Sequence, residues 1–278
     1  MTALNLACGV YYFDDPKWMN IDWEADSSKV LQKNLFKPLE FDDCTFDFIY
    51  TSHFIEHITL DAATRLLEEC HRVLKPNGVL RIVTPDFEKI CEEYLLQKTL
   101  GFFQKSEYVK FTLTDQMTRN RPGGGIQYWF ALAKSDPELQ EFMSTWSGSI
   151  AQSKEIISKQ NRKLHSRVRN VRRFFANPAI VRRRVIWKYC NIVVFLFPKW
   201  FRDQHVSLCR PGEQHIYMHD FSSLKSLLID VGFDNVTRVS PWITRSHYPE
   251  ITKLDLDSSG KPRKGKESMY VEAGKEEI

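Results

Sequence analysis

The chain has 278 residues, of which 42% are hydrophobic, so it can bury a sizeable core as one large domain or as a domain with an insertion. Its six cysteines are scattered without paired spacing, which indicates reduced thiols and argues against a disulfide framework or a cysteine zinc site. The net charge of +4 is small, so overall charge alone identifies no partner.

The first predicted element is a short apolar strand that ends in small residues, Leu4-Asn5-Leu6-Ala7-Cys8-Gly9. Only small side chains at such a strand end let a ligand approach the backbone, so this loop is a candidate ligand cradle. A second strand is predicted to end at Asn20-Ile21-Asp22, where the carboxylate is placed to accept hydrogen bonds from a ribose diol. Because ligands bind beyond the carboxyl ends of parallel strands, both strand ends are expected to face one crevice.

The first strand begins so early that no room is left for a signal peptide, and a cytoplasmic location is expected. The distance from Gly9 to Asn20 is too short for a crossover helix, which predicts a loop as the first connection. Residues Val30–Asn34 fit a short third strand, and Phe46–Thr51 fit a fourth strand that is buried on both faces.

An amphipathic helix is predicted over residues 61–74, because its apolar residues recur at helical spacing. The sequence Pro76-Asn77-Gly78 is expected to stop it. A fifth strand then covers residues 79–84 and ends at Pro85-Asp86. Strands that alternate with helices in this way indicate a parallel sheet with right-handed crossovers.

The regular alternation breaks near residue 97 and resumes only near residue 213, which predicts a mostly helical insertion that forms a lid over the crevice. After it, residues 221–231 fit a helix with Asp220 as its N-cap and Gly232 just past its end. Two closing strands are expected over 234–240 and 268–273.

Four segments in this order resemble the compact subgroup of class I S-adenosylmethionine-dependent methyltransferases: Leu4–Gly9 with Asn20–Asp22, residues 46–57, residues 72–78, and Pro85-Asp86. The resemblance covers residues 3–88 and, more loosely, 213–275. It implies an α/β, Rossmann-like, seven-stranded class I methyltransferase sheet whose last two strands form an antiparallel hairpin at its edge, here with a large helical insertion. It also implies S-adenosyl-L-methionine as the cofactor.

The same resemblance implies a set of cofactor-binding residues: Asn5, Ala7, Cys8, Gly9, Asp22, Trp23, Asn34, Leu35, Thr51 and Ser52. Two of them depart from the family pattern. Ala7 stands where the family usually has glycine, so we expect an ordinary β conformation there. Asn34 stands where many relatives have aspartate, and its carbonyl can accept from an adenine amino group without the charge. Trp23 either covers an adenine face or is a partly exposed edge aromatic.

His53-Phe54-Ile55-Glu56-His57 matches the H-x-x-E-H pattern of inverted zinc peptidases. That motif needs a long helix and a distant third ligand, whereas His53 directly follows a strand. We therefore favour His53 as a general base in the crevice, with packing or a bond to the cofactor carboxylate as the alternative. Asp86 either orients the methyl acceptor or caps the next helix.

Residues 154–210 carry a net charge of +13, against −9 for the rest of the chain. This basic segment is a solvated lid surface, an anion-binding wall, or an RNA-binding surface that uses Phe174, Phe175 and Trp187. Within it, Val185–Phe201 is too short and too interrupted to span a bilayer. That stretch is expected to be lid core, with contact at a membrane surface as the alternative.

The chain is thus expected to divide into residues 1–96, a cofactor-binding half, residues 97–212, a basic helical lid, and residues 213–278, which complete the core. The expected reaction is methylation of a hydroxyl on a sugar, nucleotide-sugar or lipid-linked glycan. A small-metabolite or RNA methyltransferase, a cofactor-binding protein without turnover, and a zinc hydrolase are the alternatives.

Overall fold

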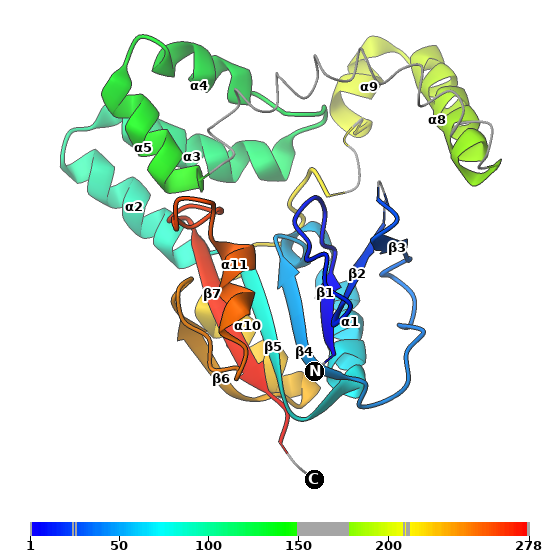
Figure 1. Cartoon of the computed structure of the whole chain (residues 1–278). Helices are drawn as coiled ribbons and strands as arrows, with labels where there is room; N and C mark the ends of the chain where they lie inside the picture. Colours follow the sequence, from blue (N-terminus) through cyan, green and yellow to red (C-terminus); the bar gives the residue numbers. More distant parts are fainter. Residues whose placement is uncertain are drawn as a thin grey trace.

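The computed structural model describes residues 2–23, 25, 27–148, 178–207, 209 and 212–276. Its described strands form one seven-stranded sheet in the order β3-β2-β1-β4-β5-β7-β6 (Figure 1). Neighbours from β3 to β5 are parallel, whereas β7 is antiparallel to both β5 and β6, which confirms the expected closing hairpin. The strands are β1 (Ala3–Leu6), β2 (Trp18–Asp22), β3 (Val30–Gln32), β4 (Phe46–Ser52), β5 (Leu74–Pro85), β6 (Asp234–Val239) and β7 (Ser268–Gly274).

A loop without a helix joins β1 to β2, as its length predicts, and two paired asparagines hold it in place. Asn5 and Asn20 are register partners on these strands, and the Asn5 side-chain amide donates to Asn20 Oδ1 at 3.2 Å. The same amide donates to the carbonyl of Tyr11 at 3.0 Å, and the Asn20 amide donates to that of Phe13 at 2.9 Å. Both asparagines are buried, so these bonds form the floor beneath the loop.

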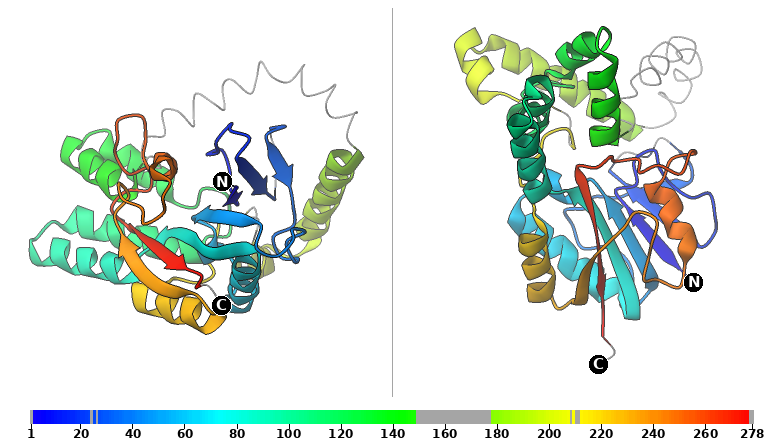
Figure 2. Two further views of the ribbon diagram at one scale, coloured as in Figure 1. Left: turned by 60° about the horizontal axis from the view of Figure 1, so that its bottom comes forward. Right: turned by 90° about the vertical axis from the view of Figure 1, so that its left-hand side faces the viewer.

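One face of the sheet is covered by α1 (Leu60–Val73) and α10 (Phe221–Val231) (Figure 2). Their apolar sides join the sheet in the largest core cluster, which includes Leu67 and Leu228. Asp220 caps α10 in a reciprocal capping box, and Gly232 ends the helix at φ 106°, as expected.

The other face is covered by the 3-10 turn η3 (Pro249–Ile251) and α11 (Thr252–Asp255) (Figure 2). Here the buried Arg81 of β5 forms ion pairs with Asp255 at 2.8 Å and with Glu272 of β7 at 2.6 Å. Tyr50 donates to the same Asp255 carboxylate at 2.8 Å. This network ties β4, β5, β7 and α11 together without leaving the guanidinium unpaired.

The fifth strand is longer than the sequence suggests. β5 begins at Leu74, directly after α1, so the expected stop signal Pro76-Asn77-Gly78 lies inside the strand rather than between helix and strand. Asn77 has φ 61°, and the register of β4 against β5 shifts between Phe46 and Phe48. The turn-forming residues therefore make an irregularity in a continuous strand.

Four helices follow β5 and lie beyond one end of the sheet (Figure 1). They are α2 (Phe87–Thr99), α3 (Phe103–Thr118), α4 (Ile126–Ala133) and α5 (Pro137–Ser147). They share a core of their own around Tyr108, Trp129 and Trp146. The proposed division at residue 96 would fall inside α2, and the division of the chain stays a proposal.

The end of α5 is joined to the loop before β7 by backbone bonds from Lys266 to Thr145 and from Glu267 to Trp146, each 3.1 Å. Gly148 and Gly265 make this close approach possible. Both have positive φ, and a Cβ on either would lie within 2.3 Å of backbone atoms of the opposite segment. This contact fixes the helices α2–α5 against the sheet.

The expectation that Val185–Phe201 forms lid core is wrong for its described side chains. They lie on α8 (Pro178–Leu196), α9 (Lys199–His205) and the turn between them. Tyr189, Phe195 and Leu196 are 67%, 72% and 78% exposed, and Trp200 is also exposed. Residues 149–177, which hold eight of the fifteen lysines and arginines of the basic segment, lie outside the described residues. Among the described helices, none is long and apolar enough to cross a membrane.

Candidate active site

The loop after β1 is a cradle with two residues in the left-handed region. Gly9 has φ 56°, which glycine adopts freely. Ala7 has φ 55°, so the expected ordinary β conformation is wrong. The steric strain of its Cβ in the left-handed conformation costs about 1–2 kcal/mol. The chain must leave β1 sharply to reach β2 through a short loop, and the tertiary structure imposes this conformation on Ala7.

Asp22 ties this cradle to the end of β2. Its Oδ2 accepts the Gly9 N–H at 2.8 Å, and the Cys8 N–H donates to the Ile21 carbonyl at 3.2 Å. Cys8 is buried beneath the loop, and burial raises the pKa of its thiol to about 12, so it is not a nucleophile. The strand ends therefore meet as the sequence predicts, with the carboxylate beside the cradle.

A second group of predicted cofactor residues follows β2 and β3. The Trp23 ring meets Phe36 edge to face, with ring centroids 6.1 Å apart. Asn34 Oδ1 accepts the Phe36 N–H at 3.0 Å and so closes a turn, while Leu35 is buried in the main core. Their roles toward the cofactor stay predictions.

Two features of the strand ends fit S-adenosylmethionine: open space at Gly9 and a buried hydroxyl, that of Thr51. A Cβ at Gly9 would meet no atom within 4 Å, so the space over the loop is free. Thr51 lies next to Leu6 of β1 in the sheet register, and its buried Oγ1 has no hydrogen-bond partner among the described residues. A carboxylate, a free hydroxyl and an open cradle at adjacent strand ends suit a ribose and an amino-acid moiety. The partly buried Ser52 follows at the end of β4.

His53 directly follows β4 with φ 52° and is held on both sides of its ring. Nδ1 lies 3.1 Å from Glu56 Oε1, and Nε2 lies 2.9 Å from Ser268 Oγ. The Ser268 hydroxyl has one proton and lies within hydrogen-bond distance of both His53 Nε2 and the Lys264 carbonyl, the latter at 3.1 Å. Burial lowers the pKa of His53 to about 4, so the ring is neutral near pH 7 rather than poised at neutrality.

Glu56 is the centre of this constellation and is completely buried. It lies on the 3-10 turn η1 (Ile55–His57) and accepts from Thr84 Oγ1 at 3.2 Å. Burial alone would raise the pKa of its carboxyl, but the interactions with His53, His57 and His215 together outweigh burial and hold the pKa below its usual range. Glu56 is therefore a carboxylate in the interior.

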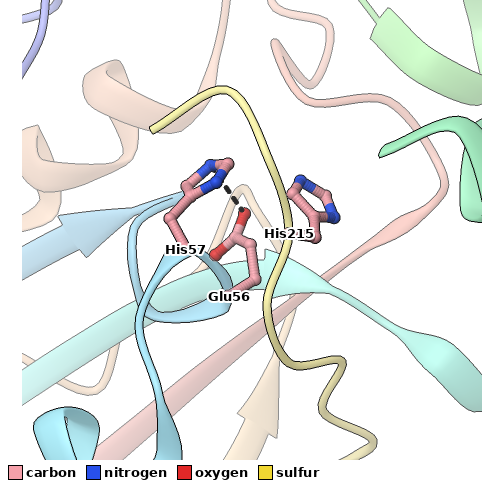
Figure 3. Close-up of side chains that lie close together, drawn as sticks. All are labelled: Glu56, His57 and His215. Atoms are coloured by element: carbon pink, nitrogen blue, oxygen red, sulfur yellow. Dashed lines mark ion pairs between the residues drawn. The ribbon is translucent and has the colours of Figure 1, made fainter. Parts of the chain in front are cut away.

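Two further imidazoles come from a segment that the sequence analysis did not include in the site. His215 and His219 lie between α9 and α10, and His215 packs edge to face on His57 at 4.8 Å (Figure 3). Burial lowers the pKa of His215 to about 3 and also lowers the pKa of His219. They lie about 160 residues from Glu56 in sequence, and only the close spacing of the two histidines could have drawn attention to them.

The loop before β7 contributes two ionisable groups near Glu56, the half-buried Lys264 and the buried Glu267. Burial lowers the pKa of Lys264. Burial also raises the pKa of Glu267 to about 8, and Ser147 Oγ donates to this carboxyl at 3.3 Å. The site thus combines the carboxylate of Glu56 with a protonated acid at Glu267 and with an amine, Lys264, whose pKa is lowered.

Asp86 caps the N-terminus of α2, which is one of the two roles that the sequence suggests for it. Its Oδ1 accepts the Lys89 N–H at the start of α2, and its Oδ2 pairs with Arg238 at 3.0 Å. The residue is buried. Whether it also orients an acceptor stays a prediction.

Residues 4–82 match the family model described as a methyltransferase domain. No match was found among curated proteins. Among solved structures, 34% of this chain aligns with 54% of a protein from Pyrococcus horikoshii OT3 at 25% identity, with a TM-score of 0.29. The chain thus spans about half the length of that protein.

A SAM-dependent methyltransferase from Archaeoglobus fulgidus aligns with 99% of this chain and 86% of its own, at 12% identity and a TM-score of 0.38. A possible histamine N-methyltransferase from Thermotoga maritima aligns with 99% of this chain and 82% of its own, at 12% identity and a TM-score of 0.39.

The matched segment contains β1 to β4, the cradle and Asp22, and extends into β5. With the parallel strands and the antiparallel β7 beside them, these features fit a class I S-adenosylmethionine-dependent methyltransferase domain. The family match over residues 4–82 supports S-adenosylmethionine as the cofactor.

Proposed function

We propose that the protein transfers the methyl group of S-adenosylmethionine to a hydroxyl group of a sugar, nucleotide-sugar or lipid-linked glycan. The proposal is carried by the position of His53 at the end of β4, the strand that pairs directly with β1 and its cradle. A hydroxyl needs a base nearby, and an imidazole at this strand end supports that role.

In this reaction the acceptor oxygen attacks the methyl carbon, and the carbon–sulfur bond breaks. The electron pair stays on sulfur and gives S-adenosylhomocysteine, while the hydroxyl proton goes to a base. The sulfonium is already activated, so holding the oxygen in line at about 3–3.5 Å supplies much of the acceleration. The position of the bound acceptor therefore matters more for the rate of methyl transfer than the strength of the base.

His53 is our candidate for the base because it directly follows β4, at the strand end that lies beside β1 and its loop. Glu56 lies beside Nδ1 of this ring and stabilises the imidazolium that forms. Asp86 is a second candidate, for orienting the acceptor.

The exposed surface of α8 and α9 favours an acceptor at an anionic membrane. Tyr189, Phe195 and Leu196 are exposed beside the cationic Lys188 and Lys199, in a segment whose sequence is strongly basic. Exposed aromatic and aliphatic side chains insert at the acyl boundary, and lysines pair with lipid phosphates. A lipid-linked glycan would present its sugar at such a surface.

Two alternatives remain. The basic segment supports RNA or an anionic metabolite as the acceptor, because its charge suits phosphate of any origin. The strained Ala7 and the uncharged Asn34 support a protein that binds cofactor without turnover.

The function is tested by incubating the protein with radiolabelled S-adenosylmethionine and three acceptor pools: lipid-linked glycans, nucleotide-sugars and total RNA. Label in a glycan or sugar fraction, lost in His53→Ala, is the expected result. Label in RNA alone, or bound cofactor with no labelled product from any pool, contradicts the proposal.

Membrane docking is tested by co-sedimentation with phosphatidylcholine vesicles with and without phosphatidylglycerol. Binding that needs the anionic lipid and is lost in Leu196→Asp is expected. Ile229→Asp is the matched control, since Ile229 is similarly exposed on α10 at the sheet. Equal loss in both variants, or no binding at all, would rule out α8 as the docking surface.

A further inference from the structure

Glu56, His57 and His215 point toward one another from two separate segments (Figure 3). Each offers one ligand atom, and these atoms all lie within 4.8 Å of one another. Two residues come from η1 and the third from the segment between α9 and α10. The cluster lies directly after the strand that ends beside the cofactor cradle.

The backbone holds the two segments together independently of the side chains. The Glu56 carbonyl accepts the Ile216 N–H at 2.7 Å and the Tyr217 N–H at 3.2 Å, and the His215 N–H donates to the Gln116 carbonyl at 2.9 Å. The three ligand atoms are therefore brought together by a preformed scaffold.

The ring of His57 is oriented as metal-bound histidines are. Its Nδ1 lies 2.8 Å from the carbonyl of Gln214, which can only accept, so Nδ1 carries the proton. The unprotonated Nε2 faces Glu56 Oε1 at 4.0 Å. A backbone carbonyl that fixes the tautomer in this way is the usual outer partner of a metal ligand. His215 Nδ1 lies 3.3 Å from Met218 Sδ.

The spacing suits a small cation. Bonds of about 2.0–2.2 Å place ligand atoms roughly 3–4 Å apart, so movements below about 1 Å would close the set. Two imidazoles and one carboxylate favour transition metals over magnesium or calcium, and three protein ligands leave positions open for an exogenous oxygen.

The surrounding charges are mixed. Glu56 interacts favourably with the half-buried Lys264, and His215 interacts unfavourably with Arg119. His53 lies 3.1 Å from Glu56 Oε1, the same carboxylate that belongs to the cluster. The pKa of Glu267 is raised to about 8, so near pH 7 this neighbour is mostly uncharged. The Glu56 carboxylate is completely buried. Its attraction for a cation is strongest there, because the protein interior screens charge weakly.

We propose that Glu56, His57 and His215 bind one divalent transition-metal cation, of the zinc, manganese or iron class. An oxygen of the methyl acceptor takes an open position on the ion, which positions that oxygen beside the cofactor. The role toward the acceptor rests on the proposed function, whereas the metal site stands without it.

The test uses the full chain, freed of metal with a chelator and titrated with Co²⁺. Visible absorption of the bound ion reports its coordination, and calorimetry reports the stoichiometry. One ion per chain is expected, with affinity at least tenfold weaker in His215→Asn and in Glu56→Gln. His247→Asn is the matched control, because His247 is an exposed histidine outside the cluster.

Circular dichroism and S-adenosylhomocysteine binding are measured on the same samples to establish that each variant is folded. If Glu56→Gln does not fold, His215→Asn alone decides, because His215 lies in a loop held by backbone bonds. A folded wild type that binds no Co²⁺, or binds it equally in His215→Asn and His247→Asn, overturns the metal site. Metal binding without methyl transfer to any acceptor would overturn the proposed function and leave the site standing.

Discussion

The backbone N–H of Gly9 donates to the carboxylate of Asp22 over 2.8 Å, so the loop after β1 and the end of β2 are one unit. Asp22→Asn keeps an acceptor for this bond but removes the charge, whereas Asp22→Ala removes both. We expect S-adenosylmethionine affinity to fall about tenfold to a hundredfold in Asp22→Ala and less in Asp22→Asn, since each charge-assisted bond contributes about 1.5–3 kcal/mol.

Equilibrium dialysis with labelled cofactor measures this series. The exposed Asp42 is the control position, and Asp42→Asn should bind as the wild type does. Unchanged affinity in Asp22→Ala would remove Asp22 from the cofactor site.

Ala7→Gly should raise the free energy of unfolding by about 1 kcal/mol, because glycine adopts the left-handed conformation at φ 55° without strain. Chemical denaturation measures the change. Ala63→Gly, inside α1, is the control and should lower stability by at least about 1 kcal/mol. A loss of stability in both variants would show that Ala7 is not strained.

Arg81→Met should lower the free energy of unfolding by roughly 3–5 kcal/mol, because it leaves Asp255 and Glu272 buried without their cation. The exposed Arg65 on α1 provides the comparison, and Arg65→Met should change stability by less than about 0.5 kcal/mol. Urea unfolding of both variants measures the difference. Similar values for the two would contradict the network's structural role.

Stability should fall as pH rises from 5 to 8 through Glu267. Burial raises its pKa to about 8 in the folded protein, against 4.5 for the ordinary group, so over this window the folded state keeps a proton that the unfolded state has lost. Ser147 donates to this carboxyl, Lys264 opposes its protonation, and Glu56 favours it.

Glu267→Gln mimics the protonated acid and should flatten this part of the pH profile. Denaturation at pH 5, 6.5 and 8 measures the slope, with the exposed Glu68→Gln as control. A profile as steep in Glu267→Gln as in the wild type would assign the pH dependence to other groups.

Local pattern was sufficient for most strands of the sheet and for the helices α1 and α10 on one of its faces. The strand before the Ala7–Gly9 loop, the strand that ends at Asp22 and the helix capped by Asp220 are where their periodicity and capping residues indicate. These features depend on neighbours in sequence, which is why a single sequence reveals them.

Features imposed by tertiary structure could not be predicted in the same way. The conformation of Ala7 follows from the path between two strands, and the approach of His215 to Glu56 follows from the return of the chain after the helices. The exposure of Phe195 was also missed, because an apolar sequence indicates burial without saying against what.

The central claim is that this chain binds S-adenosylmethionine in the cradle between Ala7 and Asp22. Calorimetric titration of the wild type with S-adenosylmethionine and S-adenosylhomocysteine tests it most directly. We predict one site per chain for both compounds, with a dissociation constant on the order of micromolar, about −8 kcal/mol. A folded protein that gives no binding heat with either compound at several temperatures would contradict the account.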